Sequence, residues 1–289
     1  MTIDNDVQRV SETSTGISGD SYSVNPSISA NGQWVAFQSY AHNLVSPDYN
    51  PMDDILVKNL VTGEIIRAST NASGEQANGG GTDPSISADG SKVAFTSWAN
   101  NLVPGTTYEG PMLFVKDIVD GSIAYVAGGV NDACISRDGQ YVTFSTHDSL
   151  VPNDTNGTGS IYRARTDGSD LRLVSADATG IADDGESLYS TISGDGRFVL
   201  FASNSTNLVA GHDSGLPEYN LKDMDSGAVT AVAPVYDEAN GHNGADYRGA
   251  ISADGRYVVF DSFSSNIVDG VGGGALFWKD TWTGQTKLV

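Results

Sequence analysis

A short motif recurs five times along the chain and constrains its fold more than any other feature. Each copy leads through Ile-Ser to an Asn-Gly or Asp-Gly pair, and an apolar run such as Trp-Val-Ala-Phe at 34–37 follows at once. Such pairs between apolar runs indicate β-hairpins, because both turn residues tolerate positive φ. The copies begin at Ser27, Ser85, Cys134, Thr191 and Ala250, and their final glycines are 49 to 59 residues apart. We therefore expect five repeated units.

Each unit contains four β-type segments. After the hairpin come Asn-Leu-Val or a near copy, a third strand (55–58 in the first unit), a glycine turn and a fourth strand (65–69). Four antiparallel strands per unit and no amphipathic helix predict an all-β fold, a five-bladed β-propeller, because a β-helix or a sandwich would give shorter, less regular periods. We expect one domain over 1–289, with repeats at approximately 26–69, 84–127, 133–175, 190–233 and 249–289.

The two ends of the chain carry similar segments. Residues 7–11 match the fourth strand at 65–69, and residues 286–289 match it again. A propeller has to join its first and last blades or leave two exposed sheet edges. We expect 7–11 to close the ring as an outer strand; the alternative is that it adds beside the C-terminal strand.

The whole unit resembles a known repeat family. The order Ser-Ile-Ser-Ala-Asp-Gly, Asn-Leu-Val, an Asp-x-Asn loop and a Thr-Gly turn is similar to the TolB-like, WD-repeat-like propeller repeat. It is closest to tandem versions in bacterial secreted or surface proteins, some of them calcium-binding. The resemblance extends from Val7 to the end and implies a propeller at the cell surface or outside the cell. It leaves the function open, because the family includes scaffolds, peptidase propellers and lyases.

Charge limits the partners. The chain has 15 Lys and Arg against 36 Asp and Glu, a net charge of −21. Such an acidic protein is repelled by phosphate, so we expect no nucleic acid and no membrane insertion, whereas divalent cations are natural partners. One cysteine excludes an internal disulfide and a cysteine metal cluster. The first residues lack the basic and apolar parts of a signal peptide.

Loop lengths distinguish the two ends of the predicted propeller. Connections between first and second strands are minimal, whereas those into the inner strands and between the middle strands are long. The exception is the connection into the inner strand of the third unit, which is only residues 128–132. Long, divergent loops on a rigid scaffold are where recognition usually lies. We therefore expect a small molecule, glycan, peptide or protein to bind at the long-loop end.

The Asp-x-Asn loops are candidate calcium sites, as the family resemblance implies. Asp48, Asn50 and Asp54 provide oxygens at positions one, three and seven of the first loop, and Asp154 and Asn156 provide the first two in the third unit. Hard cations prefer such oxygens, although three fall short of the usual ~6–8. The alternative is that Asp and Asn here only form turns by bonding their own backbone.

Aromatic residues near the inner strands are candidate ligand contacts. Tyr22, Tyr189 and Tyr247 lie within six residues before their expected inner strands, and Arg248 follows the last. Tyrosines at a channel mouth stack on a sugar or clamp a peptide, and a scarce arginine anchors an anionic group. Arg248 is alternatively paired with a nearby acidic side chain.

His212, Glu218 and His242 are the candidate catalytic residues, because they are unique departures from the repeat that combine acid and base. No nucleophile motif accompanies them. We therefore favour a non-catalytic binding propeller, with calcium as the expected cofactor. The alternative is an enzyme, a lyase or hydrolase with or without a metal, acting in the central funnel; a structural spacer is a third hypothesis.

Overall fold

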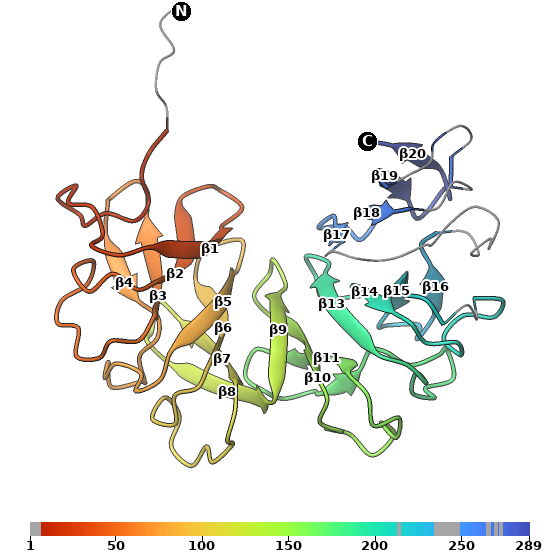
Figure 1. Cartoon of the computed structure of the whole chain (residues 1–289), viewed down its shortest axis with the longest axis horizontal. Helices are drawn as coiled ribbons and strands as arrows, with labels where there is room; N and C mark the ends of the chain where they lie inside the picture. The colour runs from red at the N-terminus through yellow and green to blue at the C-terminus, as the bar shows by residue number, and fades with distance from the viewer. Residues whose placement is uncertain (1–6, 213–214, 234–248, 264–266, 269–270, 272–273) are drawn as a thin grey trace, which may run out of the picture.

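The computed structural model describes residues 7–212, 215–233, 249–263, 267–268, 271 and 274–289. In these residues twenty β-strands form five antiparallel sheets of four strands, and consecutive strands are neighbours within each sheet. The sheets, called blades below, follow one another around an arc with their first strands on the inside (Figure 1). The predicted five-bladed β-propeller is confirmed, and the part of the chain described contains no helix.

The strand boundaries repeat from blade to blade. The first blade contains β1 (Ser23–Ile28), β2 (Trp34–Ser39), β3 (Asp54–Asn59) and β4 (Ile65–Arg67). The second contains β5 (Gly81–Ile86), β6 (Lys92–Ser97), β7 (Met112–Asp117) and β8 (Ile123–Gly128). The third contains β9 (Val130–Ile135), β10 (Tyr141–Thr146), β11 (Ser160–Arg165) and β12 (Arg172–Leu173). The fourth contains β13 (Ser187–Ile192), β14 (Phe198–Ser203), β15 (Glu218–Asp223) and β16 (Val229–Ala231). The fifth contains β17 (Ala250–Ile251), β18 (Tyr257–Ser262), β19 (Ala275–Asp280) and β20 (Thr286–Leu288).

The recurring motif forms the turn between the first two strands of every blade. In the second blade, Ser87 Oγ donates a hydrogen bond to Asp89 Oδ1 at 2.7 Å and accepts one from the Lys92 N–H at 3.0 Å. Gly90 has a φ of +79°, a conformation that strains residues with a side chain. The same two bonds recur in the other blades from Ser29, Ser136, Ser193 and Ser252. The motif is thus a self-bonded turn that sets the hairpin register.

The hydrophobic core consists of layers between neighbouring blades. Between the first two blades, Ala36 and Val57 pack with Val93 and Phe95. The phenylalanine in the second strand of each blade is at most 3% exposed: Phe37, Phe95, Phe144, Phe201 and Phe260. The middle strands of the first four blades are buried on both faces, which explains why they appear in the sequence as continuous apolar runs.

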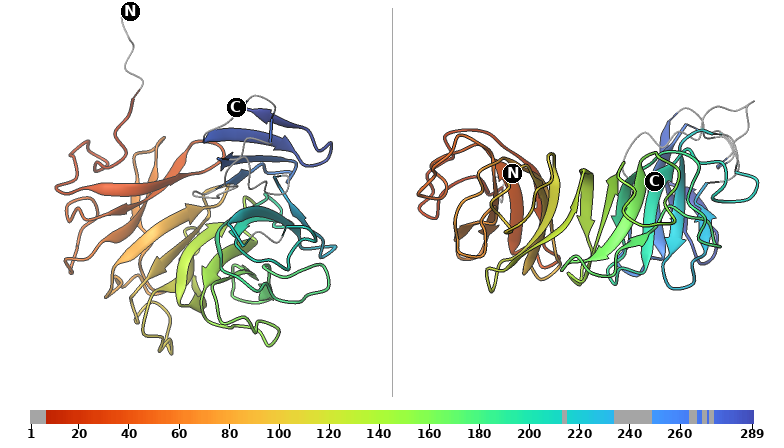
Figure 2. Two further views of the ribbon diagram at one scale, coloured as in Figure 1. Left: turned by 45° about the vertical axis from the view of Figure 1, so that its right-hand side comes forward. Right: turned by 90° about the horizontal axis from the view of Figure 1, so that it is seen from below.

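The expected closing strand is not formed. Residues 7–11 belong to none of the five sheets and do not add beside β20, and the first and last blades lie at the two open ends of the arc (Figures 1 and 2). The fourth position of the last sheet is already filled by β20. Glu12 O instead accepts a hydrogen bond from Lys58 Nζ at 2.9 Å, just as Thr70 O accepts one from Lys116 Nζ before the next blade. The N-terminal segment therefore has the place of a connection that enters the first blade.

Candidate functional site

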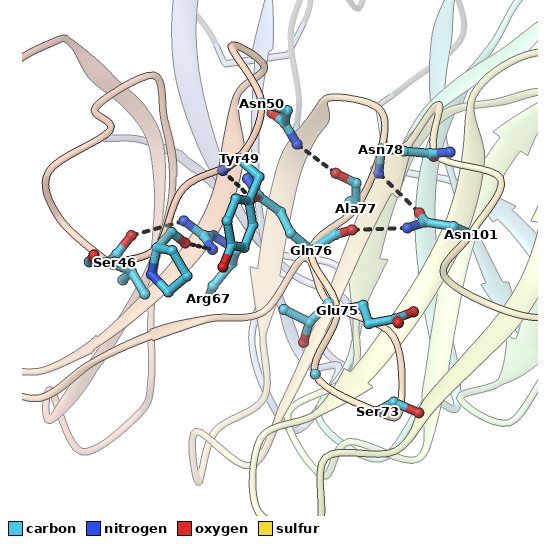
Figure 3. A pocket seen from close by; sticks show the side chains of 14 residues that line it. Ser46, Tyr49, Asn50, Arg67, Ser73, Glu75, Gln76, Ala77, Asn78 and Asn101 are labelled. Atoms are coloured by element: carbon cyan, nitrogen blue, oxygen red, sulfur yellow. Dashed lines mark hydrogen bonds between the residues drawn. The ribbon is translucent and has the colours of Figure 1, made fainter.

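An open groove lies at the long-loop end of the first blade. The β2–β3 connection and the β4–β5 connection meet there around a space of about 760 Å³ (Figure 3). Polar side chains dominate its lining: Val45, Ser46, Pro47, Tyr49, Asn50, Arg67, Thr70, Ser73, Gly74, Glu75, Gln76, Ala77, Asn78 and Asn101.

Hydrogen bonds between the two connections hold the groove in shape. Arg67, at the end of β4, donates to the carbonyl oxygens of Pro47 at 2.7 Å and Val45 at 2.9 Å. The Tyr49 N–H donates to Gln76 Oε1 at 2.8 Å, and Asn50 Nδ2 donates to Ala77 O at 2.6 Å (Figure 3). These bonds fix the loop that carries Tyr49, so the groove is organised before any ligand arrives.

The first candidate calcium loop lies beneath this groove and contains its own cation. Arg67 Nε is 2.7 Å from Asp54 Oδ2, and Arg67 Nη2 is 3.8 Å from Asp48 Oδ2. Burial raises the pKa of Asp54, and the guanidinium partly offsets that rise. Gln76 Nε2 also donates to Asp48, at 2.8 Å.

Asn50 does not face these carboxylates as a ligand. Its side-chain oxygen accepts the Met52 N–H at 2.8 Å, while its amide nitrogen donates to Ala77. This is the turn-forming role that the sequence left as the alternative. A positive side chain already sits between the two acids, so calcium in the first loop stays a prediction that this geometry does not favour.

The third blade has a different charged cluster at the corresponding place. The Tyr162 hydroxyl donates to Asp154, and Asn156 Nδ2 donates to Asp183 Oδ1 at 2.7 Å. Asn156 Oδ1 accepts the Thr158 N–H at 3.0 Å, so this side chain presents a donor to the cluster. Burial, with Asp154 as a smaller cause, raises the pKa of Asp183 to about 7.

Sequence reasoning missed Asp183. It lies on the β12–β13 connection, where its N–H bonds to Ser175 O as the Ala77 N–H bonds to Ser69 O in the first blade. The signal that marks it is the change from alanine to aspartate at one repeat position. Among the described residues, no three His, Cys, Asp or Glu side chains gather in a metal-like group.

His212 and Glu218 meet in the fourth blade. His212 Nδ1 is 2.8 Å from Glu218 Oε2, and their side chains are only 14% and 8% exposed. They stand at the positions of Asp48 and Asp54 in the first blade. Glu218 begins β15, the third strand of its blade, just as Asp54 begins β3. The remaining members of this predicted site, His242, Tyr247 and Arg248, lie outside the described residues.

The other two predicted tyrosines lie apart. Tyr22 is 60% exposed and stacks on Tyr40, with ring centroids 4.5 Å apart. Tyr189 has a φ of +57° in β13 and lines a space of about 100 Å³ with Glu186 and Pro217. Neither tyrosine lines the first-blade groove.

The inner strands of the first four blades surround a central cavity of about 480 Å³. Asn25 and Asp83 reach it from bulges with φ of +51° and +52°, and Asn25 Nδ2 donates to Asp83 Oδ1 at 3.1 Å. Ser190 Oγ is buried there without a hydrogen-bond partner. No histidine belongs to the described lining, so the cavity offers polar contacts and no evident acid–base pair.

No family model matches the chain, and no curated protein matches it. Solved structures match nearly its whole length. TolB from Acinetobacter baumannii is 17% identical, with a TM-score of 0.53 and 92% of this chain covered against 53% of that one. Oligogalacturonate lyase in complex with manganese is 13% identical, with a TM-score of 0.58 and coverages of 94% and 65%. The β-propeller domain of the Trilobed protease from Pyrococcus furiosus, which is described as having an open velcro topology, is 12% identical, with a TM-score of 0.55 and coverages of 94% and 71%.

These similarities concern the fold. The chain spans about half the length of the TolB protein that it matches, and the matched proteins differ in activity, as expected for a scaffold used for many purposes. The chain has a TolB-like β-propeller fold.

Proposed function

We propose that this chain is a non-catalytic recognition domain that binds a glycan in the first-blade groove. The observation that carries the proposal is Tyr49, a residue that is 81% exposed on a loop tied down by Gln76 and Arg67. An exposed ring held in place offers a flat apolar surface at little cost in conformational entropy. A sugar ring has an apolar face and a rim of hydroxyls, so it matches a tyrosine surrounded by polar groups.

The Asn101 amide and the Glu75 carboxylate provide polar groups in the groove. Asn101 Nδ2 donates to Gln76 O at 2.9 Å and Asn101 Oδ1 accepts the Asn78 N–H at 3.0 Å, so the Asn101 amide has a set orientation (Figure 3). Its second N–H and the exposed carboxylate of Glu75 are a donor and an acceptor for sugar hydroxyls. The described lining contains one carboxylate, Glu75, whereas glycoside hydrolysis uses a pair of them, which favours binding over catalysis.

The alternative is an enzyme acting at the central funnel. The His212–Glu218 contact supports it, because a histidine beside a carboxylate is a common acid–base unit. The pair is largely buried at a repeat position that carries ion pairs or polar contacts in other blades, which favours a structural role. We therefore place recognition at the groove.

Isothermal titration with a panel of neutral and acidic oligosaccharides tests the proposal. We expect Tyr49→Ala to weaken binding by at least tenfold, because the stacking surface is lost. Trp282→Ala is the matched control: this aromatic is 66% exposed in the β19–β20 turn, at the opposite end. No binding to any member of the panel, or equal losses in both variants, would overturn the proposal. Binding of peptides alone would favour the other predicted ligand class.

A position at the bacterial cell surface or outside the cell is part of this proposal. It rests on the repeat resemblance and on the net charge of −21, which also argues against nucleic acid. The described residues form no helix that could cross a membrane.

A further inference from the structure

Two buried carboxylates in the third blade lack a cationic partner. Asp154 is 6% exposed and Asp183 is 1% exposed. Neither takes part in any ion pair among the described residues, although every other charged cluster at this repeat position contains a cation or a titratable base. Burying uncompensated negative charge is strongly unfavourable, so a counter-charge is missing from the protein itself.

Strand register shows which residue in the third blade stands in place of the cation of the first blade. In the first blade Arg67 pairs with Leu56, the third residue of β3, and its guanidinium lies against Asp54 and Asp48. In the third blade Leu173 pairs with Tyr162, the third residue of β11. Leu173 therefore occupies in the third blade the position that Arg67 occupies in the first. The side chain at this position is charged in the first blade and apolar in the third.

The acidic residues around this position also differ between the two blades. Ser160 stands in the third blade where Asp54 stands in the first, and Asp183 stands where Ala77 stands. The third blade therefore also has two carboxylates but lacks the guanidinium. In the fourth blade a basic side chain, His212, lies beside the single acid Glu218. Only the third blade combines two acids with no basic side chain at this place, among the residues that the structure describes.

One oxygen of this cluster also lacks a hydrogen-bond donor. Asp154 Oδ1 is buried and has no partner, whereas its Oδ2 accepts from Tyr162. The hydroxyls of Ser175 and Ser187 lie on Asp183, at 3.2 Å and 2.5 Å from its two carboxylate oxygens. The oxygens of the group come from carboxylates and hydroxyls, and the one nitrogen in contact with it is Asn156 Nδ2, which donates to Asp183.

We propose that a hard divalent cation, with Ca²⁺ as the best match, binds between Asp154 and Asp183. Carboxylates and hydroxyls suit calcium, and water completes a shell of ~6–8 oxygens. Asn156 is a positioning residue, because its amide holds Asp183 while its own oxygen is bound to Thr158. The ion ties the β10–β11 connection to the β12–β13 connection and so stabilises the junction between the third and fourth blades.

Thermal unfolding of the whole chain tests this, in EDTA and with added CaCl₂, together with Tb³⁺ luminescence excited through nearby tyrosine. A ligand that binds only the folded state raises Tm with its concentration. We expect a calcium-dependent rise in Tm and sensitised Tb³⁺ emission for the wild type, and loss of both in Asp183→Asn and Asp154→Asn. Asp48→Asn, the matched change in the first blade, keeps both signals.

Leu173→Arg is the second arm, and it does not depend on how well the aspartate variants fold. It places the guanidinium of the first blade beside the third-blade acids, so we expect higher Tm in EDTA and no calcium response. A wild type whose Tm and Tb³⁺ emission do not respond would overturn the proposal and leave the pair neutralised by a proton. Signals that vanish in Asp48→Asn and persist in Asp183→Asn would overturn it too, by placing the ion in the first blade.

Discussion

Asn50 and Asn156 stand at equivalent places in their loops, and their side chains make the same kinds of hydrogen bond. Each oxygen accepts a backbone N–H two residues on, and each amide nitrogen donates across to the next connection. An Asp-x-Asn pattern is compatible with both a cation site and a turn, because the sequence does not say which end of the amide faces the acids. Asp183 was hidden for a related reason: its contact with Asn156 joins two connections 27 residues apart.

Asp223 offers a test of electrostatics at the residue scale. Arg197 donates to both its oxygens, Nε at 2.9 Å and Nη2 at 2.8 Å, and holds the pKa of Asp223 well below its usual range. The charged form is therefore favoured in the folded state, and its stabilisation is present above the unfolded pKa of about 3.9 and is lost as the pH falls through the lower folded value.

We expect Asp223→Asn to lower the free energy of unfolding by at most about 1 kcal/mol near neutral pH, since the pair is partly solvated. The difference from the wild type should shrink in urea titrations as the pH falls below about 4. A difference that stays constant into acid would show that the carboxylate charge is not its cause.

Elements were the most predictable level. Five self-bonded Ser-Asp/Asn-Gly turns and apolar runs of fixed length specify the four strands of each blade locally, which is why the fold followed from the pattern. The contacts that join one blade to the next are less visible in the sequence. Lys116 is 5% exposed in the third strand of its blade, and its Nζ donates to Thr70 O at 3.2 Å, Asn71 O at 3.0 Å and Gly121 O at 2.6 Å.

We predict that Lys116→Met destabilises the protein by roughly 1–3 kcal/mol, because it leaves these carbonyls without their donor. Lys287→Met, on the exposed side of β20, should stay within about 0.5 kcal/mol of the wild type. Urea unfolding of the two variants measures the difference. Similar values would mean that water replaces the ammonium without penalty and that the lysine does not anchor the connection.

At the scale of the whole molecule, the five blades follow from the repeat, whereas closure of the ring does not. Repetition specifies each blade and each interface between neighbours, and nothing in the repeat specifies how the first blade meets the last. The exposed faces show the consequence. Ile28 in β1 is 61% exposed, whereas the matching isoleucines of the next three blades, Ile86, Ile135 and Ile192, are at most 7% exposed. Residues 7–11 carry a strand-like sequence yet pair with no sheet, and the outer position of the last blade, which they were expected to fill, is occupied by β20.

A matched pair of leucine-to-alanine substitutions tests whether the arc stays open in solution. Leu113 and Leu276 are both the second residue of the third strand in their blades; Leu113 is 0% exposed and Leu276 is 53% exposed. Leu113→Ala should cost about 2–5 kcal/mol by opening a cavity between the second and third blades, as buried leucines do. Leu276→Ala removes a side chain from an uncovered face, so we expect a loss within about 0.5 kcal/mol. If calorimetry or urea unfolding gave similar losses for both, the last blade would be covered in solution, and the ring closure expected from the sequence would be restored.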